Sequence, residues 1–204
     1  TGYTFSKWNT KADGSGTNYN SGASYTSNAA VTLYAIWTAN TYTVTYNANN
    51  GSNAPQNQTK THDKALTLST DKPERTGYSF KNWNTKADGS GTSYNSGASY
   101  TGNSAITLYA QWTVNTYTIT YNANNGTGAP QSQTKTHNEA LTLSPNAPTR
   151  TGYTFLGWGT SASDTSADYA KGANLKLLKQ VTMISTYIGK VIMTDMYMLY
   201  IMNM

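Results

Sequence analysis

The sequence repeats itself with a period of 75 residues. Residues 1–5 (TGYTF) return as residues 76–80 (TGYSF) and again as residues 151–155 (TGYTF). Between residues 1–75 and 76–150, 56 of 75 positions are identical, without a gap. A fixed period of this length indicates one structural unit per repeat. The chain is therefore constrained to fold as a series of small modules, each built from the same pattern of residues.

The recurring motifs divide the chain into repeats and linkers. Residues 41–115 make one complete repeat, and residues 1–40 are the C-terminal half of a truncated repeat. A third repeat covers residues 116–187 and becomes degenerate after about residue 173. The linkers have three residues, as in Thr38–Asn40, and leave little freedom between neighbours. We therefore expect the modules to be arranged as a semi-rigid rod.

Residues 188–204 form an atypical tail rich in methionine. All six methionines of the chain lie between residues 183 and 204. Two interpretations are open: a genuine apolar C-terminal strand region, or an artefact of reading frame or assembly. The composition changes inside a repeat and not at a repeat boundary, and this favours the artefact.

Within the complete repeat, apolar and polar residues alternate over short stretches. Tyr42, Val44 and Tyr46 alternate with threonines, and residues 106–112 show the same period of two. Turn-forming residues such as Asn49–Gly51 separate these stretches. No stretch has a convincing helical period, so the sequence predicts small, mostly β modules.

Aromatic side chains carry most of the information about function. They make up 12% of the residues, and the tryptophans occupy two positions per repeat. In a small module with few aliphatic residues, Trp and Tyr must supply much of the core. The alternative is an exposed aromatic platform that binds a ligand, for which the candidates, if exposed, are Trp83, Trp112 and Tyr109. The predicted core of the complete repeat consists of its alternating apolar and aromatic side chains: Tyr42, Val44, Tyr46, Leu66, Leu68, Tyr78, Phe80, Trp83, Ile106, Leu108 and Trp112.

No group of residues has the pattern of a catalytic, cofactor-binding or metal site. The chain has no cysteine, which excludes thiolate nucleophiles and Cys-based zinc sites. His62 and His137 lie one period apart, beside Asp63 and Asn138 respectively. One histidine per repeat supplies neither an acid–base pair nor converging metal ligands. We interpret both histidines as solvated strand or turn residues.

A short acidic loop has a superficial likeness to a calcium site. Asp13–Gly16 and Asp88–Gly91 share the sequence DGSG. A calcium loop needs several oxygen ligands at alternate positions and usually a closing Glu. No such Glu follows, and Ser163 stands at the Asp position in the third repeat. The sequence therefore predicts a plain turn.

Three motifs carry a resemblance to a known family. They are residues 31–37 (VTLYAIW), residues 42–51 (YTVTYNANNG) and residues 148–158 (PTRTGYTFLGW). Together they resemble the Listeria–Bacteroides repeat, the B-repeat family named from internalin B, over roughly residues 1–173. The resemblance implies a β-grasp-like module in an extracellular protein of the bacterial cell surface, with signal peptide and anchor outside this sequence. It implies no enzymatic activity, no catalytic residues and no cofactor.

We therefore expect a non-catalytic repeat region of a bacterial surface protein that acts as a spacer or stalk, with adhesion as a further role. The alternative is a multivalent array that binds carbohydrate or host glycoprotein, one site per repeat. Expected partners are such a glycan or glycoprotein and the neighbouring repeats. The net charge of +5 is scattered, which argues against nucleic acid. No apolar stretch is long enough for membrane insertion.

Overall fold

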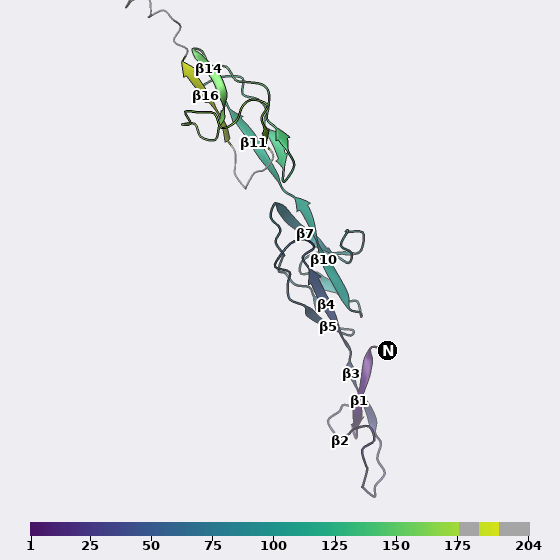
Figure 1. Cartoon of the computed structure of the whole chain (residues 1–204). Coiled ribbons are helices and arrows are strands. Elements are labelled where there is room, and N and C mark those ends of the chain that lie inside the picture. The colour runs from purple at the N-terminus through teal and green to yellow at the C-terminus, as the bar shows by residue number, and fades with distance from the viewer. Residues whose placement is uncertain (176–183, 192–204) are drawn as a thin grey trace, which may run out of the picture. The chain divides into compact units, whose positions relative to one another are not determined.

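The computed structural model describes residues 1–175 and the backbone of residues 184–191 (Figure 1). Every regular element there is a β-strand, and no helix occurs among these residues. The prediction of a mostly β chain is confirmed, whereas the β-grasp-like rod stays a prediction. Apart from the backbone of residues 188–191, the predicted Met-rich tail lies outside the described residues.

The chain divides into two compact units, Thr1–Thr113 and Val114–Met204. The first unit holds residues 1–40 and nearly all of the complete repeat, and the second unit holds the third repeat. No helix in the described part of either unit is long and apolar enough to cross a membrane.

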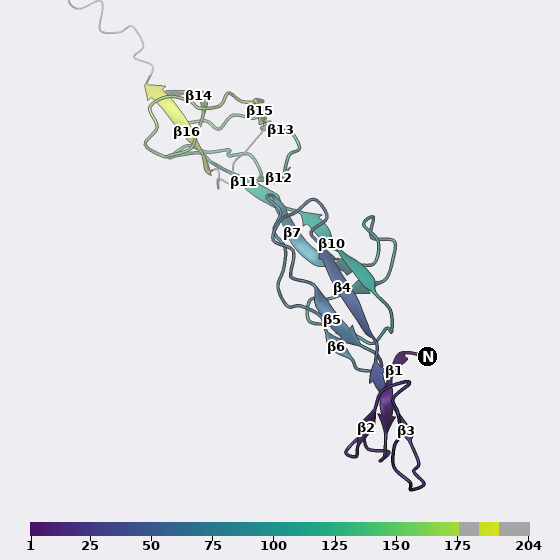
Figure 2. The ribbon, with the colours of Figure 1, turned by 60° about the horizontal axis from the view of Figure 1, so that its bottom comes forward.

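The complete repeat forms a five-stranded mixed sheet and a separate strand pair (Figure 2). Its strands are β4 (Thr41–Asn47), β5 (Gln58–Thr61), β6 (Leu66–Thr67), β7 (Tyr78–Asn84), β8 (Ser93–Tyr94), β9 (Ser99–Tyr100) and β10 (Ile106–Val114). The large sheet has the order β5-β4-β10-β7-β8, and β6 pairs with β9. The first and last strands, β4 and β10, are parallel neighbours, and Val44 lies opposite Ile106. β4 pairs antiparallel with β5, β7 with β8, and β6 with β9.

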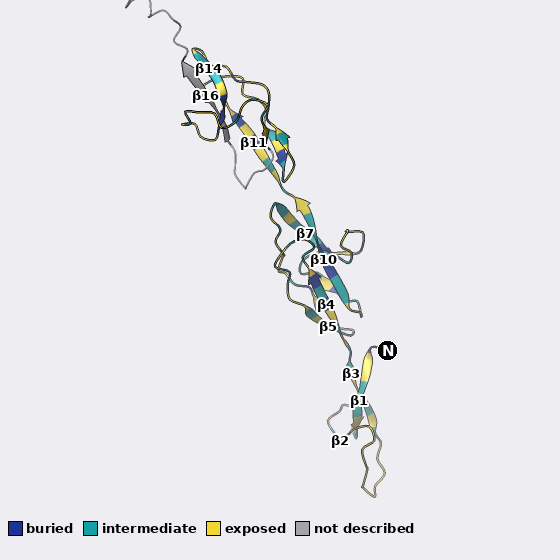
Figure 3. Ribbon diagram, in the orientation of Figure 1, coloured by how far each residue is buried: buried dark blue, intermediate teal, exposed yellow. Residues whose placement is uncertain are grey.

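Alternate side chains of β4 and β10 form the centre of the core. Val44 and Leu108 have no exposed surface, and the same alternation buries Tyr46 and Ala110 (Figure 3). Trp83 of β7 is also fully buried, and its ring meets the Tyr46 ring with centroids 4.9 Å apart. The period of two in the sequence thus has a direct cause, because successive residues of a strand point to opposite faces.

The predicted core residues fall into three groups. Five of them are buried in one cluster: Val44, Tyr46, Leu68, Trp83 and Leu108. Others are half-buried and pack against that cluster: Leu66, Phe80, Ile106 and Trp112. Tyr42 and Tyr78 are half-buried outside it. The Tyr42 hydroxyl lies 3.1 Å from His62 Nδ1, and the Arg75 guanidinium lies 3.9 Å from the centre of the Tyr78 ring.

The third repeat has a sheet of equivalent order, β12-β11-β16-β14. Its strands are β11 (Thr116–Asn122), β12 (Gln133–Thr136), β13 (Leu141–Thr142), β14 (Tyr153–Gly159), β15 (Asn174–Leu175) and β16 (Ile184–Val191). β11 and β16 are parallel, as β4 and β10 are. The pairing of β14 with β16 shifts register between Phe155 and Trp158, where the alternation of the sequence also changes parity. Its described core consists of Ile119, Tyr121, Leu143, Trp158 and Leu175.

Residues 1–40 form a smaller antiparallel sheet of order β2-β1-β3. Its strands are β1 (Tyr3–Asn9), β2 (Asn18–Tyr19) and β3 (Tyr34–Ala39). No described strand pairs with the second edge of β3, where the complete repeat has β4 beside β10. Trp8 is consequently 38% exposed and Trp37 58% exposed.

Candidate functional site

The aromatic residues considered as ligand-binding candidates occupy different environments. Trp83 has no exposed surface to offer a ligand. Trp112 is half-buried, and its indole Nε1 donates hydrogen bonds to Ala48 O (3.1 Å) and Asn49 O (3.0 Å). Tyr109 is half-buried on the same strand. The structure therefore does not bring these three side chains together as an open platform.

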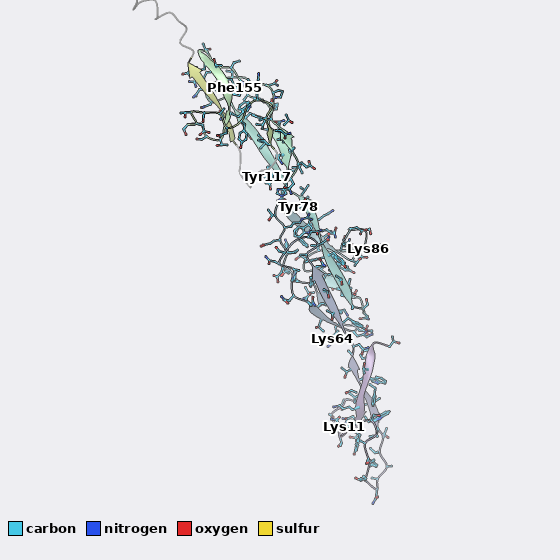
Figure 4. All side chains as sticks on the ribbon, in the orientation of Figure 1. Lys11, Lys64, Tyr78, Lys86, Tyr117 and Phe155 are labelled. Carbon is cyan, nitrogen blue, oxygen red and sulfur yellow. The ribbon has the colours of Figure 1, made fainter. Side chains whose placement is uncertain are left out.

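The DGSG loop of the complete repeat is held by one buried asparagine, Asn84. Its Oδ1 accepts hydrogen bonds from Lys86 N (2.9 Å) and Gly91 N (3.0 Å). Its Nδ2 donates to Gly89 O, Gly91 O and Ser93 Oγ at 3.0–3.1 Å. Figure 4 shows this loop beside the sheet, with Lys86 labelled. A buried amide whose groups are all paired fixes the loop as a structural element.

The aspartate of this loop caps its own turn. Asp88 Oδ1 accepts a hydrogen bond from Ser90 N at 3.0 Å, and Asp13 does the same with Ser15. Hydrogen bonds from the serine lower the pKa of both carboxyl groups, and the bond from the serine backbone N–H makes the largest contribution. In the described part of the chain, no three His, Cys, Asp or Glu side chains are placed to hold a metal ion.

The junction between residues 1–40 and the complete repeat is held by backbone and side-chain hydrogen bonds. Asn40, the last linker residue, bonds to both sides through its backbone. Asn40 N donates to Gly2 O (2.9 Å), and His62 N donates to Asn40 O (2.8 Å). The Asn40 side chain also accepts a hydrogen bond from Thr4 Oγ1 at 2.6 Å. The linker thus extends the hydrogen bonding of both strands that it joins.

Side chains close the same junction. The rings of Tyr3 and His62 meet edge to face, with centroids 5.3 Å apart. The Tyr3 hydroxyl donates to Asp63 Oδ2 at 3.4 Å, and His62 Nε2 lies 3.5 Å from the same carboxylate oxygen. Gly2 is buried against the imidazole, and a Cβ atom there would lie 1.9 Å from His62 Nε2. Its φ of +83° also favours glycine. The histidine that the sequence indicates as a solvated residue therefore packs against the preceding segment.

A second unexpected feature is a buried lysine, Lys60. It has no exposed surface, and its Nζ donates hydrogen bonds to Thr61 O (2.7 Å) and Asn103 Oδ1 (3.2 Å). The Asn103 Nδ2 in turn donates to Asp63 Oδ1 at 2.8 Å. This network joins β5 to the segment before β10. Burial of a lysine is rare unless the ammonium is paired, and two of the three Lys60 donors have partners here.

Sequence reasoning missed the junction residues Gly2, Tyr3 and Asp63 and the buried Lys60. The sequence contains one recurring feature that points to the junction residues and one that points to the buried lysine. The motif TGY occurs once in each of the three repeats, and Lys60 recurs as Lys135, which is 2% exposed. Neither feature says what the residue contacts, because partners such as His62 for Gly2 and Asn103 for Lys60 lie tens of positions away.

Comparison with known proteins gives a consistent result along the chain. The family model of the Listeria–Bacteroides repeat domain matches residues 1–36, 42–111 and 117–184. The resemblance inferred from the motifs is thereby confirmed. No solved structure matches the chain.

Relatives include proteins of two bacterial genera. A "Putative Gly-rich membrane protein" of Evansella cellulosilytica is 34% identical over 171 residues, which covers 78% of this chain and 19% of the relative. "Internalin H" of Listeria monocytogenes is 36% identical over 115 residues, covering 54% of this chain and 20% of the relative. The chain thus spans about a fifth of the length of these relatives.

Proposed function

Because the chain belongs to the Listeria–Bacteroides repeat domain family, we propose that it is a non-catalytic repeat region of a bacterial cell-surface protein and acts as a spacer or stalk. The names of its relatives, a membrane protein and an internalin, support an extracellular position at the cell surface. A spacer needs folded modules and connections that resist bending.

The junction of the first unit is the observation that carries this proposal. Gly2 and Tyr3 pack against His62 and Asp63, and Asn40 bonds to both sides. A flexible linker would leave these groups in water and would let the two segments reorient freely. A packed linker restricts that motion, which is the property that a stalk requires.

The burial of tryptophan favours the spacer over the glycan-binding array. Trp83 has no surface for a sugar, and Trp112 uses its only donor on backbone carbonyl groups. In the complete repeat, the exposed large hydrophobic residue is Val114, at 37%, and no aromatic residue reaches that exposure. A carbohydrate platform relies on exposed aromatic faces, and the described residues of this repeat offer few.

The stiffness of the junction is tested with two spin labels in the full chain. Labels at Ser15→Cys and Ser90→Cys, both exposed positions, report the distance between the two segments, because the native chain has no cysteine. We expect a narrow distance distribution that Gly2→Ala broadens, since the new methyl group overlaps His62. Gly22→Ala is the matched control, with φ of +78° but open space around the Cβ. A broad distribution in the unsubstituted chain would contradict the stiff spacer.

Binding is tested separately with a panel of glycans and mucin-type glycoproteins on the full chain. We expect no saturable binding. Saturable binding that is lost in Trp112→Ala or Tyr109→Ala, with the fold retained, would replace the spacer with the multivalent array.

A further inference from the structure

The complete repeat places its first and last strands side by side at the centre of the sheet. β4 and β10 run parallel, with register from Val44 opposite Ile106 to Asn47 opposite Tyr109 (Figure 2). The chain enters the repeat at the start of β4 and leaves it at the end of β10. The two ends of the repeat are therefore attached to opposite ends of one parallel strand pair.

This arrangement determines how the repeat experiences a pull along the chain. Tension draws β4 and β10 past each other along their length. The hydrogen bonds of a parallel pair are evenly spaced, so such a pull loads all of them together. Sliding cannot begin until the whole set fails at once.

Residues 1–40 show the opposite geometry. β1 and β3 are antiparallel, and Tyr3, at the start of β1, lies opposite Ala39, at the end of β3. A pull on the two ends of this segment acts at one end of the pair. Its hydrogen bonds then break one after another, each bearing the load alone.

We propose that the complete repeat is a tension-bearing module and that the β4–β10 pair is its mechanical clamp. This inference deepens the proposed spacer function, because a stalk between a cell surface and an attached object transmits the force between them. Part of the clamp is shielded from water, since Val44 and Leu108 have no exposed surface and Tyr46 is buried. Competing water therefore cannot easily replace the hydrogen bonds at these positions under load.

Side chains extend the clamp beyond the paired residues. The indole of Trp112, near the end of β10, donates to Ala48 O and Asn49 O just after β4. Asn49 Nδ2 donates in return to Ala110 O at 2.9 Å. These bonds join the exit end of β10 to the far end of β4, so they are also loaded when the strands slide.

The third repeat keeps the same backbone arrangement. β11 and β16, its first and last strands, are parallel, with Thr120 opposite Ile184. The parallel pairing therefore persists where the sequence of the last strand has diverged from Ile106–Val114. Backbone hydrogen bonds do not depend on side-chain identity, which explains how a clamp of this kind survives such divergence.

Force spectroscopy on the full chain tests the clamp, since the chain has no native cysteine to interfere with attachment. Handles at Thr41→Cys and Thr113→Cys pull β4 and β10 along each other. Handles at Thr41→Cys and Ala105→Cys pull on the same end of both strands. All three positions are exposed. We expect the first pair to rupture at a several-fold higher force than the second, at the same loading rate. Equal forces would overturn the clamp.

A side-chain variant provides an independent measurement. Trp112→Phe removes the indole donor, and we expect it to lower the rupture force with the first pair of handles and not with the second. Trp37→Phe is the matched control, because Trp37 occupies the equivalent position and is 58% exposed. Denaturant unfolding of each variant separates loss of fold from loss of mechanical resistance. If Trp112→Phe does not fold, the rupture forces of the two handle geometries alone decide whether the β4–β10 pair is the mechanical clamp.

The two proposals fail in different ways. Equal rupture forces with a narrow spin-label distribution would remove the clamp and leave the stiff spacer. A broad distribution with unequal rupture forces would leave a tension-bearing chain that is flexible between its modules.

Discussion

Residues 1–40 and 76–115 have nearly the same sequence and differ strongly in burial. Trp8 is 38% exposed, whereas the equivalent Trp83 is fully buried. Leu33 is half-buried, whereas the equivalent Leu108 has no exposed surface. The difference lies in what each segment meets. In the complete repeat, β4 lies beside β10 and supplies Tyr46 against the tryptophan ring, and residues 1–40 have no such strand.

One feature is the same in both segments. Asn9 and Asn84 are both fully buried, and each hydrogen-bonds to the loop that follows it. All of these partners lie within nine residues of the asparagine. The comparison teaches that structure with local partners forms in either context, whereas burial of the tryptophan requires a strand from the other half of the repeat.

The largest expected difference concerns the two tryptophans. Trp83→Ala should reduce the free energy of unfolding of the complete repeat by about 3–5 kcal/mol, because it leaves a cavity in the core. Trp8→Ala should cost less, about 1 kcal/mol, because Trp8 is already 38% exposed and its ring packs against Phe5. Denaturant unfolding monitored by amide exchange in each segment measures both. Equal costs would show that residues 1–40 hold a core of their own.

Completing the first segment should abolish that difference. A copy of residues 41–75 placed directly before Thr1 supplies the missing strand, just as residues 41–75 directly precede Thr76 in the complete repeat. We expect Trp8 to become protected from acrylamide quenching and Trp8→Ala to become about as costly as Trp83→Ala. A chain with Trp37, Trp83, Trp112 and Trp158 replaced by Phe isolates the Trp8 signal. Unchanged quenching would contradict the role assigned to β4.

The asparagine loop should behave alike in both segments. Asn84→Ala and Asn9→Ala each remove the hydrogen bonds that a buried side chain makes to loop backbone groups, at an expected cost of about 1–3 kcal/mol to the local loop. The exchange rates of the Gly91 and Gly16 amides, which bond to these side chains, measure the effect. Ser90→Ala and Ser15→Ala are controls, since both side chains are exposed. A much larger effect at Asn84 would mean that the loop depends on the rest of the repeat.

The smallest effect concerns alkaline pH. Burial raises the pKa of Tyr46 in the complete repeat. Its folded state therefore holds the phenol proton more tightly than the unfolded state. The resulting stability is present below the unfolded pKa of about 10 and is lost as pH rises through the folded pKa.

We accordingly expect the free energy of unfolding of the complete repeat to fall above about pH 10, and Tyr46→Phe to flatten that fall. Denaturant unfolding at a series of pH values measures the slope. Tyr121, whose pKa burial also raises, supplies the matching variant Tyr121→Phe in the third repeat. An unchanged slope in both variants would assign the alkaline loss to other groups.

The period of two and the turn residues allowed the strands of each repeat to be predicted, since both depend on neighbours a few positions away. The burial of Val44 and Leu108 follows the same alternation. The environments of the tryptophans do not follow from this alternation. Trp83 and Trp112 are both tryptophans of the same repeat, yet one is fully buried and the other hydrogen-bonds at the edge of the core.

The junction and the clamp could not be predicted for a related reason. Nothing near Gly2 in the sequence indicates that His62 will pack against it, sixty positions away. Nothing in residues 41–47 indicates that their sheet neighbour is parallel and lies in residues 106–114. The sequence by itself determined the repeat, its strands and its family, because these depend on local pattern. Only the tertiary structure decided which strands pair, which aromatic rings are buried and how the linker is held, because each of these depends on contacts between residues far apart in the chain.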